Sequence, residues 1–395
     1  MTNGAAILTI NAGSSSVKFS VYAAAEEPHE LVVGQIESLG PSARLKTSVN
    51  GERIEREIGA ADQKVALRTI LDVADQALEQ RHVASVGHRI SHGGVDFAGP
   101  EELTEEVVAK LAALAPLSPL HQPHNLAAIE AAKVAFPNAI QIGCCDTSFH
   151  QGHPWVNDTF ALPRRFYDDG VRRYGFHGLS YDYVTGALAA NEPEIAAGRV
   201  VIAHLGSGAS MCAVNGGRSV ASTMGFSALD GLPMGTRCGQ LDPGVVLYLI
   251  EQKGMTPAEI STLLYTESGL KGLSGGSHDM RTLENSNTPE AAQAIDYFVF
   301  RIRRELGAMA AVLGGLDALV FCGGIGENSR TIRARVCENM DWLGISVNAQ
   351  ANADNARQIG NGATKVMVIP TDEERVIARA CARAIQNRHS GLNLI

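Results

Sequence analysis

Two stretches of the chain share one pattern, and this repeat constrains the fold more than any other sequence feature. In the first, an apolar run at residues 7–10 leads into a Gly/Ser-rich turn at residues 11–16 and a second strand-like run at residues 17–22. In the second, residues 200–214 repeat that order, with Gly206 in the place of Gly13. The copies lie about half of the 395-residue chain apart. The repeat and the length predict two related domains, each with a strand–turn–strand hairpin.

Helix and strand patterns alternate along the rest of the chain. Apolar periodicity predicts helices at residues 64–81, 104–114 and 123–135, and Thr371-x-x-Glu374 is a capping box that predicts a last helix. Further helices are predicted after Asp242-Pro243, Thr256-Pro257 and Thr288-Pro289. Strands are predicted near residues 139–143, 317–321 and 366–369. This alternation predicts an α/β architecture.

The composition excludes several classes of protein. A net charge of −9 argues against nucleic acid or a membrane surface as the main partner, although it leaves room for a small anionic substrate. The chain has no run of about 18 apolar residues, and its start lacks the basic-then-apolar order of a signal peptide. Seven irregularly spaced cysteines indicate reduced thiols. We therefore expect a cytoplasmic protein that binds neither nucleic acid nor membranes.

Two glycine-rich turns are candidate anion sites. Residues 11–18 combine backbone N–H groups, three serine hydroxyls and Lys18. Residues 323–328 follow a predicted strand and lead into a helix, so their N–H groups and the helix N-terminus suit phosphate or ribose. The local pattern of residues 11–18 alone is explained equally well by a phosphate site and by an ordinary serine-rich hairpin turn.

Several loops carry side chains suited to charge stabilisation. Arg89, Arg237 and His177 lie in glycine-rich segments, and Asp146 follows a predicted strand. Each has an ordinary structural reading, and the local pattern of Asp146 by itself favours a helix N-cap. Together with two glycine turns they match the needs of phosphoryl transfer, which are charge clamps, a metal carboxylate and positioning. Neither H-E-x-x-H nor G-x-S-x-G occurs, so a metalloprotease and a serine hydrolase lack support.

An ordered set of motifs resembles the acetate kinase family and extends from residue 7 to residue 374. The motifs are INAGSSSVKFSVY, GHRISHGG, PLHQPHNL, DTSFHQ, RRYGFHGLSYDYV, HLGSGASM, GLPMGTRCG, DPG, FCGGIGENS and PTDEE. Propionate kinases share most of these blocks. A propionate kinase, or a broader short-chain carboxylate kinase, therefore stays open as the alternative to acetate.

The resemblance implies the α/β fold of the actin/sugar-kinase/Hsp70 superfamily, with two duplicated actin-like ATPase domains and an active site in the cleft between them. The expected domains are residues 1–147 plus 375–395, and residues 148–374. The resemblance also implies a transferase that forms a homodimer, uses Mg²⁺ or Mn²⁺, and converts ATP and acetate into ADP and acetyl phosphate by direct in-line transfer.

Carried over residue by residue, the resemblance implies a role for each matching position. The expected catalytic residues are Asp146, His177, Arg89 and Arg237, with His121 in support. Asn11 and Glu373 would hold the metal ion. Arg89 would also bind the substrate, beside a small pocket of Ser91, Leu120, Phe176 and Ala228. The residues expected at the phosphates and nucleotide are Ser14, Ser16, Lys18, His204, Leu205, Gly206, Ser207, Gly208, Asp279, Met280, Arg281, Gly324, Ile325, Gly326, Glu327 and Asn328.

The chain departs from the family pattern at a few of these positions. Ser207 stands where the family usually has Asn, and Ser91 and Ala228 stand where Val and Pro usually line the substrate pocket. The smaller Ala228 predicts room for propionate. Asp372 replaces an Asn and adds a carboxylate beside Glu373. Two rivals remain: an ATPase of the same superfamily without small-acid chemistry, and a non-catalytic binding module.

Overall fold

The computed structural model describes residues 4–13, 16–49, 51–78, 81–119 and 121–390. The chain forms two compact units. The first unit contains Met1–Phe149 and Asp372–Ile395, and the second contains His150–Thr371. The last part of the chain therefore returns to the unit in which the chain began.

The described part of the first unit contains an eight-stranded sheet in the order β5-β4-β3-β2-β1-β6-β8-β7. All eight residues of β1 are buried, because helices cover both faces of this central strand. The strand β1 is antiparallel to β2 and parallel to β6, which is parallel to β8. The strands are β1 (Ala5–Ala12), β2 (Val17–Ala23), β3 (His29–Glu37), β4 (Gly40–Val49), β5 (Glu52–Ala61), β6 (His82–Ile90), β7 (Glu101–Glu102) and β8 (Ile140–Cys145).

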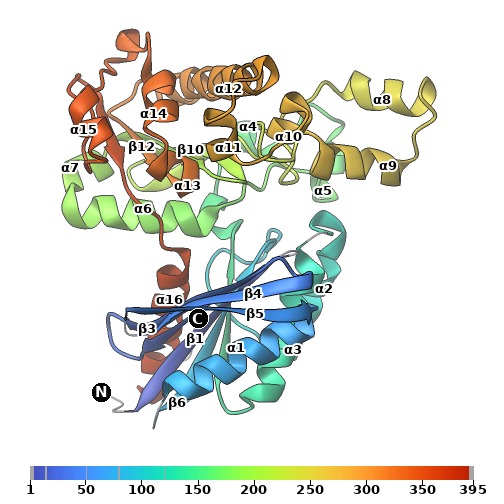
Figure 1. The fold of residues 1–395 in the computed structure, drawn as a ribbon, viewed down its shortest axis with the longest axis vertical. Coiled ribbons are helices and arrows are strands. Elements are labelled where there is room, and N and C mark those ends of the chain that lie inside the picture. Colours follow the sequence, from blue (N-terminus) through green and yellow to red (C-terminus); the bar gives the residue numbers. More distant parts are fainter. Residues whose placement is uncertain (1–3, 14–15, 50, 79–80, 120, 391–395) are drawn as a thin grey trace. The chain divides into compact units, whose positions relative to one another are not determined.

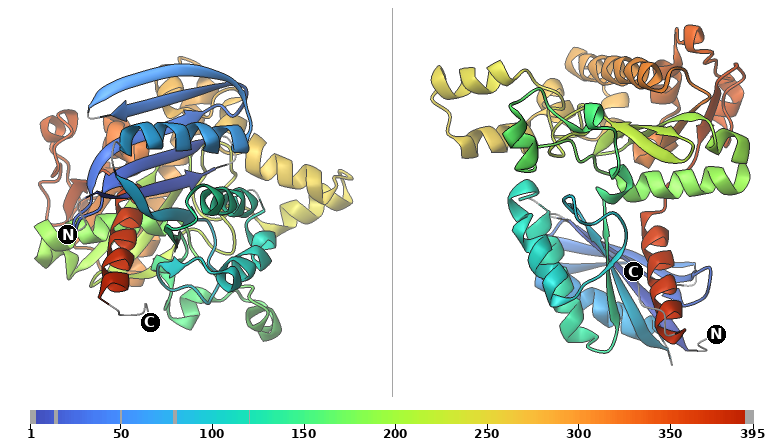
Figure 2. Two further views of the ribbon diagram at one scale, coloured as in Figure 1. Left: turned by 90° about the horizontal axis from the view of Figure 1, so that it is seen from below. Right: turned by 180° about the vertical axis from the view of Figure 1, so that it is seen from behind.

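Helices cover the two faces of this sheet. The helix α3 packs on β1 and β6 from one side, while α16 packs on β1, β6 and β8 from the other (Figures 1 and 2). The helices of the unit are α1 (Gln63–Leu78), α2 (Glu105–Ala113), α3 (Gln122–Ala135) and α16 (Glu373–His389). The helices expected near residues 64–81, 104–114 and 123–135 are confirmed.

The second unit contains a five-stranded sheet in the order β11-β10-β9-β12-β13 within the described ranges. Its strands are β9 (Arg199–Leu205), β10 (Ala209–Asn215), β11 (Arg218–Ser222), β12 (Ala318–Cys322) and β13 (Lys365–Val368). The long helix α12 and the helix α6 lie on opposite faces of this sheet (Figure 1). Its helices are α4 (Trp155–Asp158), α5 (Arg164–Asp168), α6 (Gly178–Asn191), α7 (Pro193–Ala196), α8 (Pro243–Glu251), α9 (Pro257–Thr262), α10 (Gly269–Ser274), α11 (Met280–Glu284), α12 (Pro289–Leu313), α13 (Gly323–Asn328), α14 (Arg330–Cys337) and α15 (Ala349–Ala353).

The two sheets share one topology at their centres. In the first, β2 is antiparallel to β1, and β1, β6 and β8 are parallel neighbours. In the second, β10 is antiparallel to β9, and β9, β12 and β13 are parallel neighbours. The hairpins β1–β2 and β9–β10 are the two copies of the sequence repeat. Asn11 and His204 therefore occupy equivalent places, each next to the last residue of its strand.

The last helix begins differently from the expected capping box. Asp372, not Thr371, caps α16, because its carboxylate accepts a hydrogen bond from the backbone N–H of Arg375 at 2.9 Å. The Thr371 amide instead donates to Glu327 Oε1 at 3.1 Å. Asp372 also pairs with Arg375 Nε at 2.9 Å, so this additional carboxylate has a structural partner.

Buried histidines make the stability of the protein depend on pH. Burial lowers the pKa of His88 to about 4 and that of His150 to about 3, whereas an unfolded imidazole titrates near 6.5. Below about pH 6.5 the unfolded chain therefore binds protons that the folded chain does not, and stability falls toward pH 4. At about pH 5 each such histidine costs roughly 2 kcal/mol. When the pH is lowered from about 7 to 5, the free energy of unfolding of His88→Gln, measured with urea, should fall by about 2 kcal/mol less than that of the wild type. Equal decreases would contradict this.

Candidate active site

Four polar side chains meet at one edge of the first sheet. Asn11 and Arg89 lie near the carboxyl ends of β1 and β6, and Asp146 follows the end of β8. These strands are parallel neighbours, so their carboxyl ends reach the same edge, which is the usual place for a site in an open α/β sheet. Glu373, the first residue of α16, completes the set. We call these four residues the Arg89 cluster.

The guanidinium of Arg89 is held on two sides. Its Nε lies 3.0 Å from Asp146 Oδ2 and 3.1 Å from Oδ1, and its Nη2 lies 2.6 Å from Oδ2. Its Nη1 donates to Asn11 Oδ1 at 3.1 Å, and Glu373 Oε2 lies 3.8 Å from Nε. Asp146 is fixed in turn, because its backbone N–H donates to the carbonyl of Ile90 at 2.9 Å. The arrangement fixes the orientation of a cation at the sheet edge.

Burial and charge act against each other in this cluster. Burial raises the pKa of Asp146 to about 6, although the charge and hydrogen bonds of Arg89 oppose the rise. Burial would lower the pKa of Arg89, but Asp146, Glu373 and Glu374 outweigh it and raise that pKa. Arg89 therefore stays charged. Its side chain is 26% exposed while that of Asp146 is 3% exposed, so the arginine remains accessible to a ligand.

The donor set fits a divalent metal bound chiefly through water and phosphate. Asn11 offers an amide oxygen and Glu373 a carboxylate, both hard donors of the kind that Mg²⁺ takes in small number beside water and substrate oxygens. Among the described residues, no group of three or more His, Cys, Asp and Glu side chains is placed to hold a metal on its own.

Ser14, Ser16 and Lys18 were expected at the first hairpin turn, and Ser14 lies outside the described residues. The Ser16 carbonyl accepts a hydrogen bond from the N–H of Gly13 at 2.9 Å. Lys18 is exposed on β2, and its charge lowers the pKa of Glu374, which burial raises. Glu374 is a neighbour of the cluster that the sequence pattern placed in a capping box and not at a site.

Of the residues expected to line the substrate pocket, Ser91 belongs to the first unit, Phe176 and Ala228 belong to the second, and Leu120 lies outside the described residues. Ser91 Oγ and Ser118 Oγ share a hydrogen bond of 2.9 Å, and the Ser91 N–H donates to Asn125 Oδ1 at 2.9 Å. His121 caps α3 without a side-chain capping bond, and its N–H donates to the carbonyl of Ser118 at 3.1 Å.

His177 has an unusual backbone conformation in the second unit. Its φ of +58° lies in the left-handed region, where a residue other than glycine is uncommon and is often functional. Its Nδ1 shares a hydrogen bond of 2.8 Å with Ser210 Oγ, which also bonds the Tyr181 hydroxyl. The ring stacks on His204 with 4.3 Å between ring centres, and His204 Nδ1 bonds Ser180 Oγ at 2.8 Å. The His177 ring is therefore fixed by both stacking and a hydrogen bond.

Arg237 and His177 approach the same glycine. A β-carbon added to Gly208 would lie 3.0 Å from His177 Nε2 and 3.8 Å from Arg237 Nη2. Arg237 Nη1 donates to the carbonyl of Ala228 at 3.0 Å, which fixes one arm of its fork. Phe176 is buried in the core of the unit, and Ala228 packs against that core. The structure thus places Phe176, Ala228, His177 and Arg237 in one unit.

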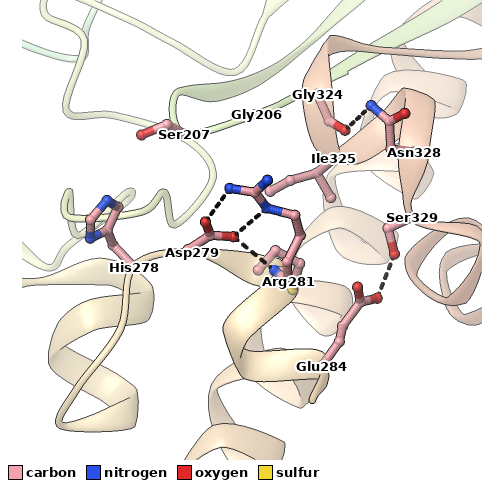
Figure 3. A pocket seen from close by; sticks show the side chains of 11 residues that line it. Gly206, Ser207, His278, Asp279, Arg281, Glu284, Gly324, Ile325, Asn328 and Ser329 are labelled. Carbon is pink, nitrogen blue, oxygen red and sulfur yellow. Dashed lines mark hydrogen bonds and ion pairs between the residues drawn. The ribbon is translucent and has the colours of Figure 1, made fainter. Parts of the chain in front are cut away.

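A cavity of about 650 Å³ opens in the second unit, within the usual size of small-molecule sites (Figure 3). Figure 3 shows Arg281 folded onto Asp279, with 2.6 Å between Nη2 and Oδ2, and Asn328 bonded to the Gly324 carbonyl. The expected residues that line the cavity are Gly206, Ser207, Asp279, Met280, Arg281, Gly324, Ile325 and Asn328.

Other expected nucleotide residues lie outside this lining. They are His204, Leu205, Gly208, Gly326 and Glu327. Glu327 Oε1 accepts the N–H groups of Gly323 and Thr371, at 2.9 and 3.1 Å, so its carboxylate holds the backbone around α13. The lining also includes His278, Glu284 and Ser329, which the sequence reasoning missed. Ser329 donates to Glu284 across 45 positions of sequence, a contact that no local pattern signals.

Comparison with known proteins gives the family. The model of the acetokinase family matches residues 6–379. The chain belongs to this family. An acetate kinase of Methylocella silvestris is 55% identical over 388 residues, which cover 94% of this chain and 96% of that protein. Within the described ranges, no helix has both the length and the apolar character needed to cross a membrane.

Solved structures give the same fold. The acetate kinase of Porphyromonas gingivalis is 36% identical with a TM-score of 0.86, over 97% of this chain and 100% of that one. A propionate kinase of Francisella tularensis is 32% identical with a TM-score of 0.89, over 95% of this chain and 98% of that one. The expected fold class, an α/β protein of the actin-like ATPase type, is confirmed.

Proposed function

We propose that the protein is an acetate kinase, an enzyme that reversibly transfers a phosphoryl group between ATP and acetate. The Arg89 cluster carries this proposal within the acetokinase family. A planar guanidinium, charged and held at the ends of three parallel strands, suits the oxygens of a carboxylate or a phosphoryl group. The name of the Methylocella silvestris relative supports acetate as the acid.

The chemistry needs positioning more than proton transfer. Acetate is ionised near pH 7 and is already a nucleophile, so no strong general base is required. Catalysis by direct in-line transfer then depends on holding the two reactants and on stabilising the charge of the transferring group. Asp146 supports this by fixing the orientation of Arg89, and it does not act as a base.

Two groups of the second unit suit the transferring phosphoryl group. We propose that Arg237 stabilises the negative charge of this group and that His177 stabilises its equatorial oxygens. His177 is presented by a constrained backbone, its Nδ1 shares a hydrogen bond with Ser210, and its Nε2 lies beside Gly208. Donors that are fixed before the reaction stabilise developing charge at little reorganisation cost.

The metal and the nucleotide complete the assignment. Asn11 and Glu373 would hold Mg²⁺ or Mn²⁺, which when bound supplies charge neutralisation at the phosphates. The cavity of Figure 3 is assigned to ATP or ADP, because a helix N-terminus and backbone N–H groups at residues 323–328 suit a nucleotide.

We further propose that the two units are separate domains and that the protein is a homodimer. The helix α8 has no buried residue, and Val245, Leu247, Tyr248 and Ile250 are exposed on it. An apolar surface of this kind is typical of a protein interface.

All seven cysteines are free thiols, which fits the expected cytoplasmic location.

The test of function is an assay that traps acyl phosphate with hydroxylamine while ATP consumption is followed. Hydroxamate that depends on acetate supports the proposal. ATP turnover that ignores acetate would favour an ATPase without small-acid chemistry, and absence of any phosphoryl transfer would favour a binding module.

Propionate is the second candidate acid, because Ala228 stands in the expected pocket and the Francisella tularensis relative is named a propionate kinase. We expect kcat/KM for propionate to approach that for acetate, with butyrate lower. One methylene is worth about 1–3 kcal/mol in a fitted pocket, so Ala228→Val should shift the ratio toward acetate at least about tenfold. A strong acetate preference in the unaltered protein would refute the widened pocket.

A further inference from the structure

A chain of hydrogen bonds outside the proposed catalytic residues leads to the segment that carries His177. His153 Nε2 lies 2.7 Å from Ser219 Oγ, and Ser219 Oγ lies 2.8 Å from His150 Nδ1. His150 Nε2 lies 2.9 Å from the carbonyl oxygen of Phe176. Ser219 lies on β11, so this chain links a strand of the second sheet to the residue before His177.

The chemistry of these groups fixes the direction of each bond. A carbonyl oxygen only accepts, so His150 Nε2 carries the proton and donates to Phe176. Burial lowers the pKa of His150 to about 3, so its ring is neutral and Nδ1 accepts from the Ser219 hydroxyl. Ser219 Oγ then accepts from His153 Nε2–H, and Cys212 Sγ lies 3.2 Å from the same oxygen. The bonds therefore run in one direction, from His153 to the Phe176 carbonyl.

The His150 ring also packs against the backbone that precedes His177. Gly175 has a φ of +75°, and a β-carbon added to it would lie 2.5 Å from His150 Cδ2. Only glycine fits this close approach. The ring thus contacts the turn of residues 175–177 by packing at Gly175 and by a hydrogen bond at Phe176.

A second set of contacts leads from His150 to the His177 side chain. The His150 ring meets the Tyr181 ring edge-on, with 5.6 Å between ring centres and 75° between planes. The Tyr181 hydroxyl bonds Ser210 Oγ, which bonds His177 Nδ1 at 2.8 Å. His150 therefore supports both the backbone and the side-chain partners of His177.

We propose that His150 is a positioning residue for the phosphoryl-transfer reaction, which holds His177 in its left-handed conformation through the Nε2–H bond to Phe176 and through Tyr181. This inference rests on the proposed function of His177. His150 is buried and is not among the residues assigned to the substrate or to the transferring phosphoryl group, so its effect passes through the geometry of residues 175–177. Ser219 and His153 support this tautomer, because the Ser219 hydroxyl donates to His150 Nδ1.

Two substitutions separate the hydrogen bond from the bulk of the ring. His150→Gln places an amide donor near the position of Nε2, whereas His150→Asn places its amide near Nδ1 and loses the donor to Phe176. A misplaced catalytic group can cost up to about a hundredfold in rate, so we expect His150→Asn to lose roughly 10- to 100-fold in kcat. The KM for ATP and acetate should change little, and His150→Gln should recover most of the kcat.

A matched control removes a buried hydrogen bond elsewhere in the unit. Thr364 is buried, and its Oγ1 lies within hydrogen-bond distance of the carbonyl oxygens of Leu316 and Leu343. Thr364→Val should lower stability while keeping kcat. The proposal is overturned if folded His150→Asn keeps normal kcat, or if the Gln and Asn variants lose kcat equally.

Nuclear magnetic resonance of ¹⁵N-labelled histidine tests the positioning without activity. We expect His150 to be the Nε2–H tautomer in the wild type, and the His177 signals to shift in His150→Asn but not in Thr364→Val. Ser219→Ala serves if His150→Asn does not fold: it removes the donor to Nδ1 while the Phe176 carbonyl keeps Nε2 protonated, so the His150 Nδ1 signal should shift and the tautomer should stay. An Nδ1–H tautomer in the wild type would overturn the proposal. Wild-type protein that makes no acyl phosphate but shows these signals would refute the proposed function alone.

Discussion

Replacing Arg89 by alanine should lower kcat/KM for acetate by more than about a hundredfold, the scale of a lost electrostatic donor at a reacting centre. Asp146 and Asn11 hold the Arg89 guanidinium in place. The other three residues of the Arg89 cluster carry no positive charge, so none of them can replace it. The acetyl hydroxamate assay measures this loss. Turnover within a fewfold of wild type would remove Arg89 from the mechanism.

The same substitution should also lower stability, because it leaves Asp146 as an unpaired buried carboxylate. Breaking a buried ion pair by removing one partner costs about 3–5 kcal/mol, and the partial exposure of Arg89 favours the lower figure. The double variant Arg89→Ala/Asp146→Asn serves as the control, since it removes the orphaned charge. It should recover much of the stability but none of the activity.

The pH dependence of this loss has a definite sign. Burial already raises the pKa of Asp146 to about 6, and without Arg89 that pKa rises further above the unfolded value of about 3.9. The folded variant then holds a proton that the unfolded chain releases, so stability increases as the pH falls. The free energy of unfolding that Arg89→Ala loses relative to the wild type, measured with urea, should therefore be smaller near pH 5 than near pH 7.5. A difference that does not change with pH would show that Asp146 is not the cause.

The sequence predicts the centre of each sheet well, for physical reasons that can be named. Apolar runs joined by Gly and Ser predicted the hairpins β1–β2 and β9–β10, because a buried strand must be apolar and a tight turn needs small residues. Helices with a cap and a proline at the first position were equally clear, as at Asp242-Pro243. The start of α16 was misassigned because Thr371 and Asp372 are both capping residues, and the contact of Thr371 with Glu327 decides between them.

The site is less accessible to sequence reasoning, because its geometry depends on contacts between distant residues. The motifs named Arg89 and Asp146 separately, but only the parallel pairing of β6 and β8 explains why they meet. Glu284 lines the cavity of Figure 3 without belonging to any motif, and Ser329 lines it although the motif FCGGIGENS gave no sign of its contact with Glu284. His150 lay inside the motif DTSFHQ, and its bond to Phe176 became visible only in the structure.

Arg237 should be as sensitive as Arg89, and the geometry of its loop explains why lysine should not replace it. One arm of the guanidinium donates to the Ala228 carbonyl while the other lies toward Gly208. The loop is tightly enclosed, since a β-carbon on Gly269 would lie 2.6 Å from the carbonyl oxygen of Arg237. A lysine ammonium has no fork and cannot make both approaches at once.

We therefore expect Arg237→Ala to lose more than about a hundredfold in kcat, and Arg237→Lys to lose at least about tenfold. Arg199→Ala is the matched control, because Arg199 is a half-exposed arginine of the same unit whose ion pair with Asp317 lies at the start of β9. It should leave kcat unchanged. If Arg237→Lys retains full activity, a point charge is sufficient at this position, and the fixed guanidinium is not what stabilises the transferring phosphoryl group.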